Sequence, residues 1–532
     1  MIASKVLLFF NTVRYLRPQQ LMSQTIKRFR KPELFWNYKK EGIEHNNYNL
    51  WIRCLDDDAI FMERFDVDGI LDNQVTLLNE TREFNGWYYS DASHLWNFNL
   101  HYLEYLVPLY GMWRLTGDKR YKDRLNEILV LWYESGSYES DSNQSYTISL
   151  RVINQLIIIE AVNDKQRLFD SIYAQYRYLI NNQEKHLMGN HYLENIKAIV
   201  ICSVVFGEED IYERYIKKLV DELDEQITKD GLHFELSLMY HKIVLEDMMR
   251  VAMILRQAGK TEYQRIVDYI SRMASALYSV EFGLNRTPLF NDAGDNVAKP
   301  TKSLLSGCKE QFEIIFQKRE IISGYYKLYG GNITLLFDCG ELAPSYMPGH
   351  AHCDCLSFEL FYFGRPVFVN CGTYQYQSKL RTFFRSTKAH NTVMICDHEQ
   401  SELWGEHRAG RRLGQIKGMI NNNTIIGSYI NYFGEEHIRS VRLDNNILEI
   451  SDKTTGDGKS FLHLAPGLRL EGETIKGVEG LDIIIAPVNA AVSTRQMPYS
   501  DNFGKLDEVE CMIFSWKADE EKHGYKIIFE EK

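Results

Sequence analysis

The chain has 532 residues, of which 45% are hydrophobic and 25% are charged, with 11 Pro. This length allows two or three domains with large cores, and the composition excludes a disordered or fibrous protein. The formal net charge of −11 argues against a general attraction to nucleic acid or to anionic membranes. A local pocket can oppose the net field, so an acidic substrate stays compatible with this charge.

The cysteines and the N-terminal sequence indicate the cellular compartment in which the protein works. The nine Cys are scattered singly apart from Cys353 and Cys355, which argues against a disulfide framework and favours a reducing compartment. Residues 1–20 contain a short apolar run, but Lys5 and Arg14 bracket it and no convincing small-residue cleavage site follows. We therefore expect no cleaved signal peptide and no membrane span. A cytoplasmic location is favoured, and a periplasmic or envelope-associated location is the alternative.

Residues 1–90 predict a partly helical, partly irregular segment, and residues 91–310 predict paired helices. In the second region, apolar residues recur at three-to-four spacing between short breaks at Gly, Asp or Asn. The first helices of successive pairs begin roughly 45 to 50 residues apart. The expected pairs are 99–116 with 119–135, 147–163 with 165–181, 190–206 with 209–228, and 239–258 with 261–280.

Residues 311–532 predict a β domain. Short β-branched and aromatic runs, among them TLLFDCG, LSFELFYF, NTVMIC, LDIIIAP and YKIIFEE, are separated by Gly, Asn, Asp and Pro. So many strands without helices between them indicate stacked antiparallel sheets. The expected fold class is therefore an α+β multidomain protein, with an N-terminal α/α toroid followed by a C-terminal antiparallel β-sandwich.

Polar residues gather near the beginnings of the first helices of these pairs. If those helices run side by side in the same direction, as in an α/α toroid, the polar groups share one rim. Helix N-termini offer unpaired N–H groups and the positive dipole end, which favour a bound anion. The alternative is that these side chains only cap helices or pair with one another. The residues are Asn97, Asn99, His101, Arg151, Asn154, Asn190, His191, Glu235, Tyr240 and His241.

The stretch MPGHAHCDCLSFEL, residues 347–360, holds two His and two Cys. On an extended strand His350 and His352 would face one side and Cys353 and Cys355 the other. Burial as small apolar residues is the expected role of the thiols. His352 could join His390 and a carboxylate in a metal site, and a hydrogen-bonded His pair without metal is the alternative.

Seven separated motifs occur in an order that resembles the heparinase II/III-like polysaccharide lyases. They are FNLHYLEYL, GNHYLENIKAIV, HFELSLMYHKIVLEDMM, PLFNDAGDN, PGHAHCDCLSFEL, VFVNCGTYQY and FRSTKAHNTVMICDHEQSELWG, and they lie within residues 84–412. The resemblance implies an α/α toroid followed by a β-sandwich, with the sugar chain bound between them. It also implies cleavage of uronate-containing polysaccharides by β-elimination.

The resemblance implies four catalytic residues. Asn190 corresponds to the amide that binds the uronate carboxylate, and His191 beside it to a helper or alternative base. Tyr240 corresponds to the proton donor to the leaving oxygen, and for one C5 configuration also to the base. His350 corresponds to the catalytic His of the β domain. The expected glycan contacts are Asn99, His101, Arg151, Glu235, His241, Arg385 and Trp404.

The resemblance further implies one divalent metal ion, zinc in the first place, and no organic cofactor. His352 and His390 match two ligands, and the third, an Asp in related members, is Asn370 here. Because a neutral amide is a weaker ligand than a carboxylate, both an occupied and an empty site stay open. The ion would hold the loops of the β domain together rather than do the chemistry.

Three classes of function remain. The first is a polysaccharide lyase acting on an acidic, uronate-containing glycan. The second is a glycoside hydrolase on an α/α scaffold, which needs two carboxylates at a cleft; Glu235, Asp292 and Asp295 form no clear pair in the sequence. The third is a non-catalytic glycan-binding or assembly factor in capsule or exopolysaccharide production. An acidic polysaccharide is the expected partner, nucleic acid is not, and the sequence leaves the oligomeric state open.

Overall fold

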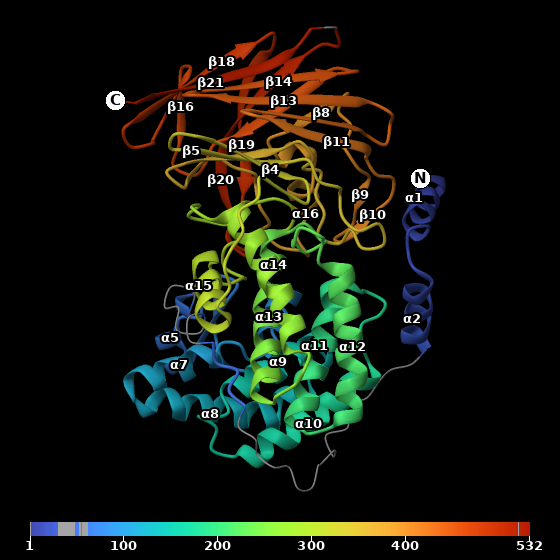
Figure 1. Ribbon diagram of the computed structural model, residues 1–532, viewed down its shortest axis with the longest axis vertical. Coiled ribbons are helices and arrows are strands. Elements are labelled where there is room, and N and C mark those ends of the chain that lie inside the picture. Colours follow the sequence, from blue (N-terminus) through green and yellow to red (C-terminus); the bar gives the residue numbers. More distant parts are fainter. Residues whose placement is uncertain (1, 30–47, 53–54, 56–61, 520, 532) are drawn as a thin grey trace.

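The computed structural model describes residues 2–29, 48–52, 55, 62–519 and 521–531. A helical half lies below a half made of stacked sheets, and the N-terminal helices α1 (Ile2–Val13) and α2 (Pro18–Phe29) lie along one side (Figure 1). No helix among the described residues is long and apolar enough to cross a bilayer.

The helical half consists of antiparallel helix pairs, as the spacing predicts. Caps explain where several of them begin, because Ser93, Asp118, Asp164 and Ser237 each accept a hydrogen bond from a backbone N–H of the following turn. The helices are α5 Val67–Leu71, α6 His94–Tyr102, α7 Leu106–Thr116, α8 Lys119–Glu134, α9 Ser145–Ile157, α10 Lys165–Asn181, α11 Gly189–Val205, α12 Glu209–Gln226, α13 Leu238–Gln257, α14 Tyr263–Glu281 and α15 Thr301–Phe312.

The first expected helix, 99–116, is divided into α6 and α7. Leu103 follows α6 with a φ of 54°, a left-handed conformation that ends the helix before α7 begins. Helix α11 packs between α9 and α13, so the first helices of the later pairs lie side by side. Their N-terminal turns therefore reach a common end of the helical half.

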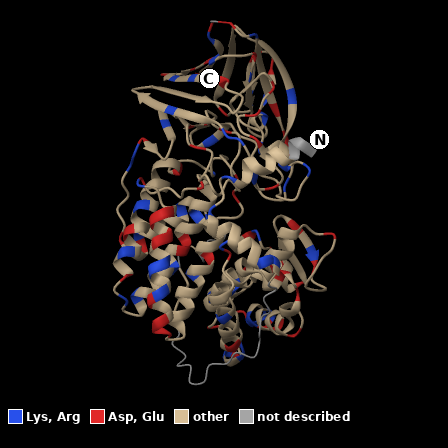
Figure 2. Cartoon of the chain, turned by 90° about the vertical axis from the view of Figure 1, so that its right-hand side faces the viewer, with Lys and Arg blue, Asp and Glu red and all other residues tan. Residues whose placement is uncertain are grey.

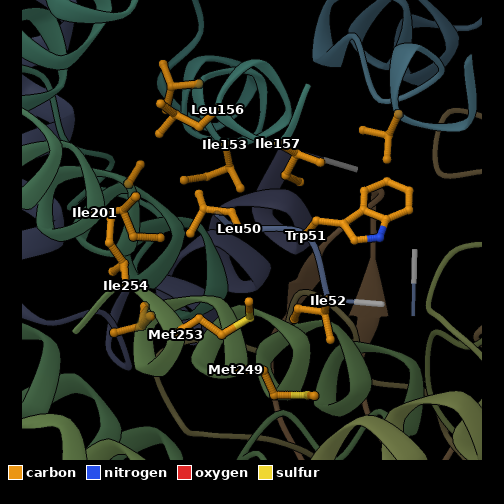
Figure 3. Close-up of a cluster of buried hydrophobic side chains, with 14 of the residues drawn as sticks. Leu50, Trp51, Ile52, Ile153, Leu156, Ile157, Ile201, Met249, Met253 and Ile254 are labelled. Carbon is orange, nitrogen blue, oxygen red and sulfur yellow. The ribbon is translucent and has the colours of Figure 1, made fainter. Parts of the chain in front are cut away.

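The core of the helical half is apolar and continuous with the N-terminal segment. Leu50, Trp51 and Ile52 lie among inward-facing side chains such as Ile153 and Met253 (Figure 3). Each of these side chains is at most 5% exposed, and burying one stabilises the fold by about 1.5–3 kcal/mol. Leu50, Trp51 and Ile52 thus belong to the helical core. The described part of the expected 1–90 segment also contains a hairpin that the sequence analysis missed, β1 (Gln74–Leu77) with β2 (Glu80–Glu83).

In the second half, the pairings between the described strands are antiparallel, as predicted, and one isolated bridge, between Gly372 and Ser500, is parallel. Among the described residues, a five-stranded sheet has the order β3-β4-β5-β6-β7, a four-stranded sheet β19-β20-β15-β8, and an eight-stranded sheet β11-β12-β13-β14-β21-β18-β17-β16. The five-stranded sheet comprises β3 Ile321–Ile322, β4 Tyr325–Gly330, β5 Ile333–Asp338, β6 Phe358–Tyr362 and β7 Arg365–Phe368. The four-stranded sheet comprises β8 Val393–Ile395, β15 Gly458–His463, β19 Ala491–Tyr499 and β20 Asp507–Trp516.

The eight-stranded sheet covers the five-stranded one. Strand β13 contacts β4, and its residues alternate between buried and partly exposed, as expected for a strand with one face on the core. The strands are β11 Gly414–Asn421, β12 Thr424–Ile430, β13 Glu436–Asp444, β14 Ile447–Thr454, β16 Arg469–Glu471, β17 Thr474–Lys476, β18 Leu481–Val488 and β21 His523–Glu531. The fold is an α/α toroid followed by an antiparallel β-sandwich, which confirms the expected fold class. Helix α15 ends at Phe312 and β3 begins at Ile321, so residue 310 falls within the last helix.

Candidate active site

A cleft of about 1040 Å³ lies between the two halves. The first turns of α9, α11 and α13 line its helical wall, and residues 345–350 and 405–409 line the opposite wall. Helices α1 and α2 line a further part of it. The structure brings Asn190, His191, Tyr240 and His350 together in this cleft, from positions up to 160 residues apart in the sequence.

Asn190 lies in the first turn of α11. Gly189 before it has a φ of 54°, and a Cβ at that position would lie 2.0 Å from Sδ of Met347. Only glycine fits there without displacing Met347. The backbone N–H of Asn190 donates to Oε1 of Glu235 at 3.2 Å, and its side chain lines the cleft. The turn thus presents a neutral amide at a helix N-terminus, where an anion is favoured.

His191 follows in the same turn of α11 and also lines the cleft. Its Nδ1 lies 3.1 Å from Oε2 of Glu184, and its ring packs against Tyr146 with centroids 4.4 Å apart. Burial lowers the pKa of His191, but the Glu184 carboxylate, with smaller contributions from Glu235 and Glu194, raises it overall. A raised pKa favours the imidazolium, which adds positive charge beside Asn190.

Tyr240 lies in the first turn of α13. Its backbone N–H donates to the Ser237 hydroxyl at 3.3 Å, and its own hydroxyl lies 2.7 Å from that of Tyr376. Burial, and secondarily the charge of Asp292, raise the pKa of Tyr240 well above its ordinary value. The phenol therefore keeps its proton at neutral pH and suits the role of a proton donor.

His350 lies in the loop that precedes β6, and its ring faces that of Tyr240 with centroids 3.9 Å apart. Its Nδ1 lies 2.9 Å from Oδ2 of Asp292, and its Nε2 lies 3.5 Å from Oε2 of Glu235. When Nδ1 carries the hydrogen of this bond to the Asp292 carboxylate, Nε2 is the ring nitrogen that can accept a proton. The segment is a loop rather than the expected strand, yet His350 and His352 still turn to one side, because both bind Asp292.

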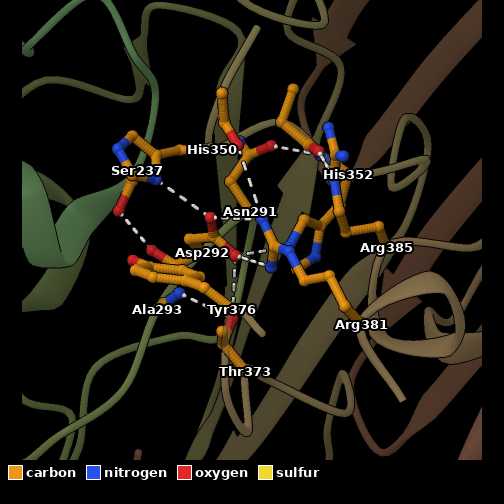
Figure 4. A network of polar contacts seen from close by, with 12 residues as sticks. Ser237, Asn291, Asp292, Ala293, His350, His352, Thr373, Tyr376, Arg381 and Arg385 are labelled. Carbon is orange, nitrogen blue, oxygen red and sulfur yellow. Dashed lines mark hydrogen bonds and ion pairs between the residues drawn. The ribbon is translucent and has the colours of Figure 1, made fainter. Parts of the chain in front are cut away.

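Asp292 is the centre of a buried polar network (Figure 4). Its Oδ1 lies 2.8 Å from Nε2 of His352 and accepts hydrogen bonds from Thr373 and Arg381. Its Oδ2 accepts from Nη2 of Arg381 at 2.8 Å and pairs with Nδ1 of His350. Burial alone would raise the pKa of Asp292, but Arg381 and the two His hold it well below its usual value. The carboxylate is charged and fixes the ring of His350.

The residues expected to bind metal lie behind this network. His352 and His390 are fully buried with ring centroids 5.3 Å apart, and neither Nδ1 of His352 nor either ring nitrogen of His390 has a hydrogen-bond partner among the described residues. The Asn370 side-chain oxygen already accepts from the backbone N–H of Asn391 at 3.0 Å. Within the described ranges no three His, Cys, Asp or Glu side chains form a group that could hold a metal ion. The residues present supply two ligands, which does not complete a site.

Four expected glycan contacts lie outside the cleft and are at most 2% exposed. Arg151 donates to Gln175 and to the backbone oxygens of His101 and Ser142. His101 bonds the backbone of Trp87, His241 that of Met273, and Arg385 binds backbone oxygens of Pro348, Ala351, Gly405 and Glu406. They are buried outside the cleft and form hydrogen bonds within the protein, so the expectation of direct glycan contact is corrected for these four to a packing role.

The other three expected contacts differ from one another. Asn99 lines the cleft. Glu235 is 1% exposed and lies behind Asn190 and His350, where it contacts both. Trp404 donates its indole N–H to Thr12 of α1 at 3.0 Å and does not line the cleft. The expectation is thus corrected for Glu235 and Trp404, which support the walls instead of facing a ligand.

Two cleft residues were missed in the sequence. Tyr376 holds the Tyr240 hydroxyl, and His407 lies with its ring centroid 5.0 Å from that of Tyr376. Burial, followed by the charge of His350, lowers the pKa of His407 to about 3, so this ring is neutral. Tyr376 belongs to the motif VFVNCGTYQY, which is the one signal that could have identified it.

Two family models match the chain. The one described as Heparinase II/III N-terminus matches residues 53–322, and the one described as Heparinase II/III-like, C-terminal, matches residues 322–521. A curated heparin-sulfate lyase from Bacteroides thetaiotaomicron is 22% identical over 410 residues, which are 64% of this chain and 58% of that protein. One from Pedobacter heparinus is 25% identical over 330 residues, 55% of this chain and 48% of that protein. The chain thus spans about half the length of these curated relatives.

Solved structures share the fold. The crystal structure of heparinase III matches with a TM-score of 0.71 at 16% identity, over 98% of this chain and 93% of that one. Heparan sulfate lyase HepC from Pedobacter heparinus matches with a TM-score of 0.55 at 17% identity, over 97% of this chain and 87% of that one. At these identities the likeness shows the fold alone. The N-terminal family model by itself covers 270 of the 532 residues, from 53 to 322, and the chain belongs to the heparinase II/III family.

Proposed function

We propose that this protein is a polysaccharide lyase that cleaves a uronate-containing glycan by β-elimination. One observation carries the proposal: an amide, a phenol and an imidazole meet in a single cleft as Asn190, Tyr240 and His350. The elimination needs a base at C5, a proton donor at the glycosidic oxygen, and donors that stabilise the carboxylate as it gains charge. Each of these needs has one matching group in the cleft.

His350 is the proposed base. Asp292 binds its Nδ1 at 2.9 Å and so leaves Nε2 to take the C5 proton. The electron pair of the C5–H bond forms the C4–C5 double bond, and the C4–O bond breaks. Tyr240 gives its proton to the leaving oxygen, and its raised pKa keeps that proton available. Tyr376, 2.7 Å away, can pass a proton back to Tyr240.

Asn190 and His191 are proposed to bind the uronate carboxylate. The C5 proton is weakly acidic while this carboxylate is charged, so hydrogen bonds and positive charge must stabilise the enolate-like intermediate. The Asn190 amide supplies donors, the N-terminus of α11 supplies a positive dipole end, and Glu184 favours the cationic form of His191. These groups favour the intermediate over the ground state because its carboxylate carries more charge.

Cleft carboxylates support elimination over hydrolysis. A hydrolase needs two carboxyl groups that face the sugar. Glu235 and Asp292 are at most 1% exposed, and both contact the ring of His350. Four of the carboxylates that line the cleft are paired with cations: Glu104 with Arg64, Glu184 with His191, Glu246 with Arg250, and Asp247 with Lys197. Glu406 lines the cleft as well and is exposed, but a single carboxylate does not make the pair that hydrolysis needs.

We infer a heparin-like or other acidic glycan as the substrate class, since the curated relatives are named heparin-sulfate lyases. A capsule or exopolysaccharide is the second candidate within this class. The free state of the described cysteines supports a reducing compartment. The predicted zinc ion has no role in this mechanism, because no step uses an ion. Elemental analysis of the purified protein measures directly whether zinc is bound.

The ultraviolet absorbance of an unsaturated uronyl end tests the proposal, because neither hydrolysis nor binding creates that double bond. Over a panel of uronate polysaccharides, we expect the native protein to generate the absorbance. Tyr240→Phe and His350→Ala should each lower the rate by about 10³-fold or more, with unchanged thermal unfolding. The exposed Tyr138→Phe is the matched control. Native rates in both site variants, or new reducing ends without absorbance, would refute the assignment.

A further inference from the structure

Helices α1 and α2 pack against the protein through polar side chains. Of the side chains of residues 6–29, all of which the structure describes, Asn11 and Gln20 are the buried ones, at 8% and 2% exposed. Gln20 donates to the backbone oxygen of Tyr346 at 3.3 Å, and Thr12 accepts from Trp404 at 3.0 Å. The inner face of this helix pair is therefore held by hydrogen bonds rather than by an apolar core.

The outer face of the same helices is apolar. Met22, Ile26 and Phe29 follow one another at spacings of four and three residues, so they share one side of α2. The exposed large apolar residues of the pair are Val6 at 48%, Leu7 at 55%, Phe9 at 57%, Phe10 at 65%, Leu21 at 39%, Met22 at 61%, Ile26 at 51% and Phe29 at 85%. This is the reverse of a surface helix on a globular protein, whose apolar stripe faces the core.

The charge of this segment is also the reverse of that of the whole chain. Residues 6–29 contain Arg14, Arg17, Lys27 and Arg28 and no Asp or Glu, whereas the chain carries a net charge of −11. Arg17 pairs with Glu225 of α12 and stacks on Tyr346, while Arg14 and Arg28 are exposed. In Figure 2 the helix beside the N mark is mostly tan, without a red residue.

We propose that α1 and α2 form a docking surface for an anionic lipid bilayer. Exposed Phe, Leu, Ile and Met side chains of an amphipathic helix enter the boundary between headgroups and acyl chains, and Lys and Arg around them bind lipid phosphates. The two helices carry no acidic residue of their own, and Arg14 and Arg28 are exposed; this positive charge is what favours the surface over an apolar protein partner. Each helix has 12 residues, too few to span a bilayer, so the pair lies in the plane of the membrane surface.

Docking leaves the cleft on the protein side of the helices. Thr12, Gln20 and Gln24 line the cleft from the inner face of the pair, while the apolar residues lie on its outer face. The cleft would therefore lie beside the membrane surface, where a membrane-bound glycan can reach it. This inference goes beyond the proposed function and does not depend on it.

Vesicle flotation tests the surface. The probes are vesicles of phosphatidylcholine containing about one third phosphatidylglycerol, and vesicles of phosphatidylcholine alone. We expect about tenfold or more protein to float with the anionic vesicles at low salt, and a large loss of binding at about 0.5 M salt. Equal binding to both vesicle types, or none to either, would overturn the proposal.

Matched variants locate the contact. Phe10 and Phe363 are both 65% exposed, and Phe363 lies between β6 and β7. We expect Phe10→Asp to lower vesicle binding about tenfold and Phe363→Asp to leave it unchanged, with equal thermal unfolding of both. Arg28→Glu should weaken binding, and Arg365→Glu, at an exposed site in the same hairpin as Phe363, should not.

Self-association is the competing result. If light scattering shows a dimer that Phe10→Asp dissociates, while neither variant changes vesicle binding, the face is an interface between copies of this chain and the membrane proposal is wrong. Glycan cleavage in solution is measured in parallel on Phe10→Asp. Because Phe10 does not line the cleft, we expect native cleavage, so failure of docking and failure of the lyase assignment are separate outcomes.

Discussion

The two walls of the cleft position their polar residues by different means. On the helical wall, Asn190, His191 and Tyr240 lie in the first turns of α11 and α13, and helix geometry places them. On the β-sandwich side, His350 lies in a loop, and its orientation comes from Asp292, 58 residues earlier in the chain. Asp292 in turn is held by Arg381, 89 residues later. Local rules build one wall, and a long-range network builds the other.

Ser237 and Glu235 each join the two walls. Ser237 accepts a hydrogen bond from the backbone N–H of Tyr240 and donates one to the backbone oxygen of Asp292 at 2.6 Å. Glu235 contacts Asn190 on one side and His350 on the other. The spacing between Tyr240 and His350 therefore depends on both walls, and it can be disturbed from either.

Breaking the network should have the largest effect. Asp292→Asn leaves Arg381 buried without a carboxylate, which costs about 3 kcal/mol or more of unfolding free energy. It also removes the charge that fixes the ring of His350, and loss of such an orienting carboxylate lowers catalysis by about 10²–10⁴-fold. Urea unfolding and the rate per folded molecule measure the two effects.

The sandwich supplies a matched control for this variant. Asp452 is also fully buried, lies 2.8 Å from Nε2 of His437 and accepts from Arg439 at 2.7 Å, but it does not line the cleft. Asp292 does not line the cleft either, but its partner His350 does, whereas His437 does not. We therefore expect Asp452→Asn to lose comparable stability and to keep the native rate per folded molecule. Equal rate losses in Asp292→Asn and Asp452→Asn would mean that Asp292 acts only through stability.

The contrast between the walls explains what the sequence could predict. Helix periodicity and the breaks at Gly, Asp or Asn identified α10 to α14 within two residues, and the same periodicity placed Asn190 and Tyr240 at helix beginnings. The helix expected at 147–163 ends earlier, at Ile157. It did not identify the break at Leu103, because a left-handed φ at a Leu has no composition signal. The strands β11, β12 and β13 were also not predicted, because the polar residues on their exposed faces interrupt the apolar runs.

The helical wall has its own sensitive point at Gly189. A Cβ there would lie 2.0 Å from Met347 and 2.9 Å from Glu235, at a φ of 54°. We expect Gly189→Ala to cost about 2–3 kcal/mol of stability and to lower the rate, because Asn190 is the next residue. Thermal unfolding and the absorbance assay measure both.

Gly207 provides a control that separates the cost of a left-handed backbone from the cost of a side-chain clash. Its φ is 63°, and a Cβ there meets nothing within 4 Å. Gly207→Ala should therefore cost about 1 kcal/mol, the penalty of a left-handed Ala, without a change in rate. If the two variants behave alike, contact with Met347 does not constrain the wall.

The pair of tyrosines gives a smaller effect. Tyr376→Phe removes the hydroxyl 2.7 Å from that of Tyr240, and we expect about a fivefold loss in rate, since one hydrogen bond is worth about 1 kcal/mol. Tyr240→Phe should lose far more. If Tyr376→Phe were the more damaging of the two in the absorbance assay, Tyr376 would be the proton donor.

Site prediction failed where function depends on distant partners. Asp292 was considered only as a hydrolase carboxylate, because nothing in PLFNDAGDN reveals that two His and an Arg from later segments bind it. Arg151 and Arg385 were expected to bind glycan, but their guanidinium groups bind backbone oxygens inside the fold. A polar residue near a helix start is exposed or buried according to tertiary contacts that spacing does not encode.

The pair of Glu184 and His191 on the helical wall gives a pH test with a defined sign. Burial lowers the pKa of His191, but Glu184, with smaller contributions from Glu235 and Glu194, raises it overall above the ordinary value of 6.5. The stabilising contribution of the pair is therefore complete below pH 6.5 and is lost as the pH rises through the folded-state pKa. Because the His191 side chain is 35% exposed, a double-mutant cycle of Glu184→Gln and His191→Gln should give about 0.5–1 kcal/mol at about pH 6, and less at about pH 9. Urea unfolding at both pH values measures the coupling. A coupling that grows with pH would mean that His191 is neutral in the folded protein, and that it cannot supply the positive charge proposed beside Asn190.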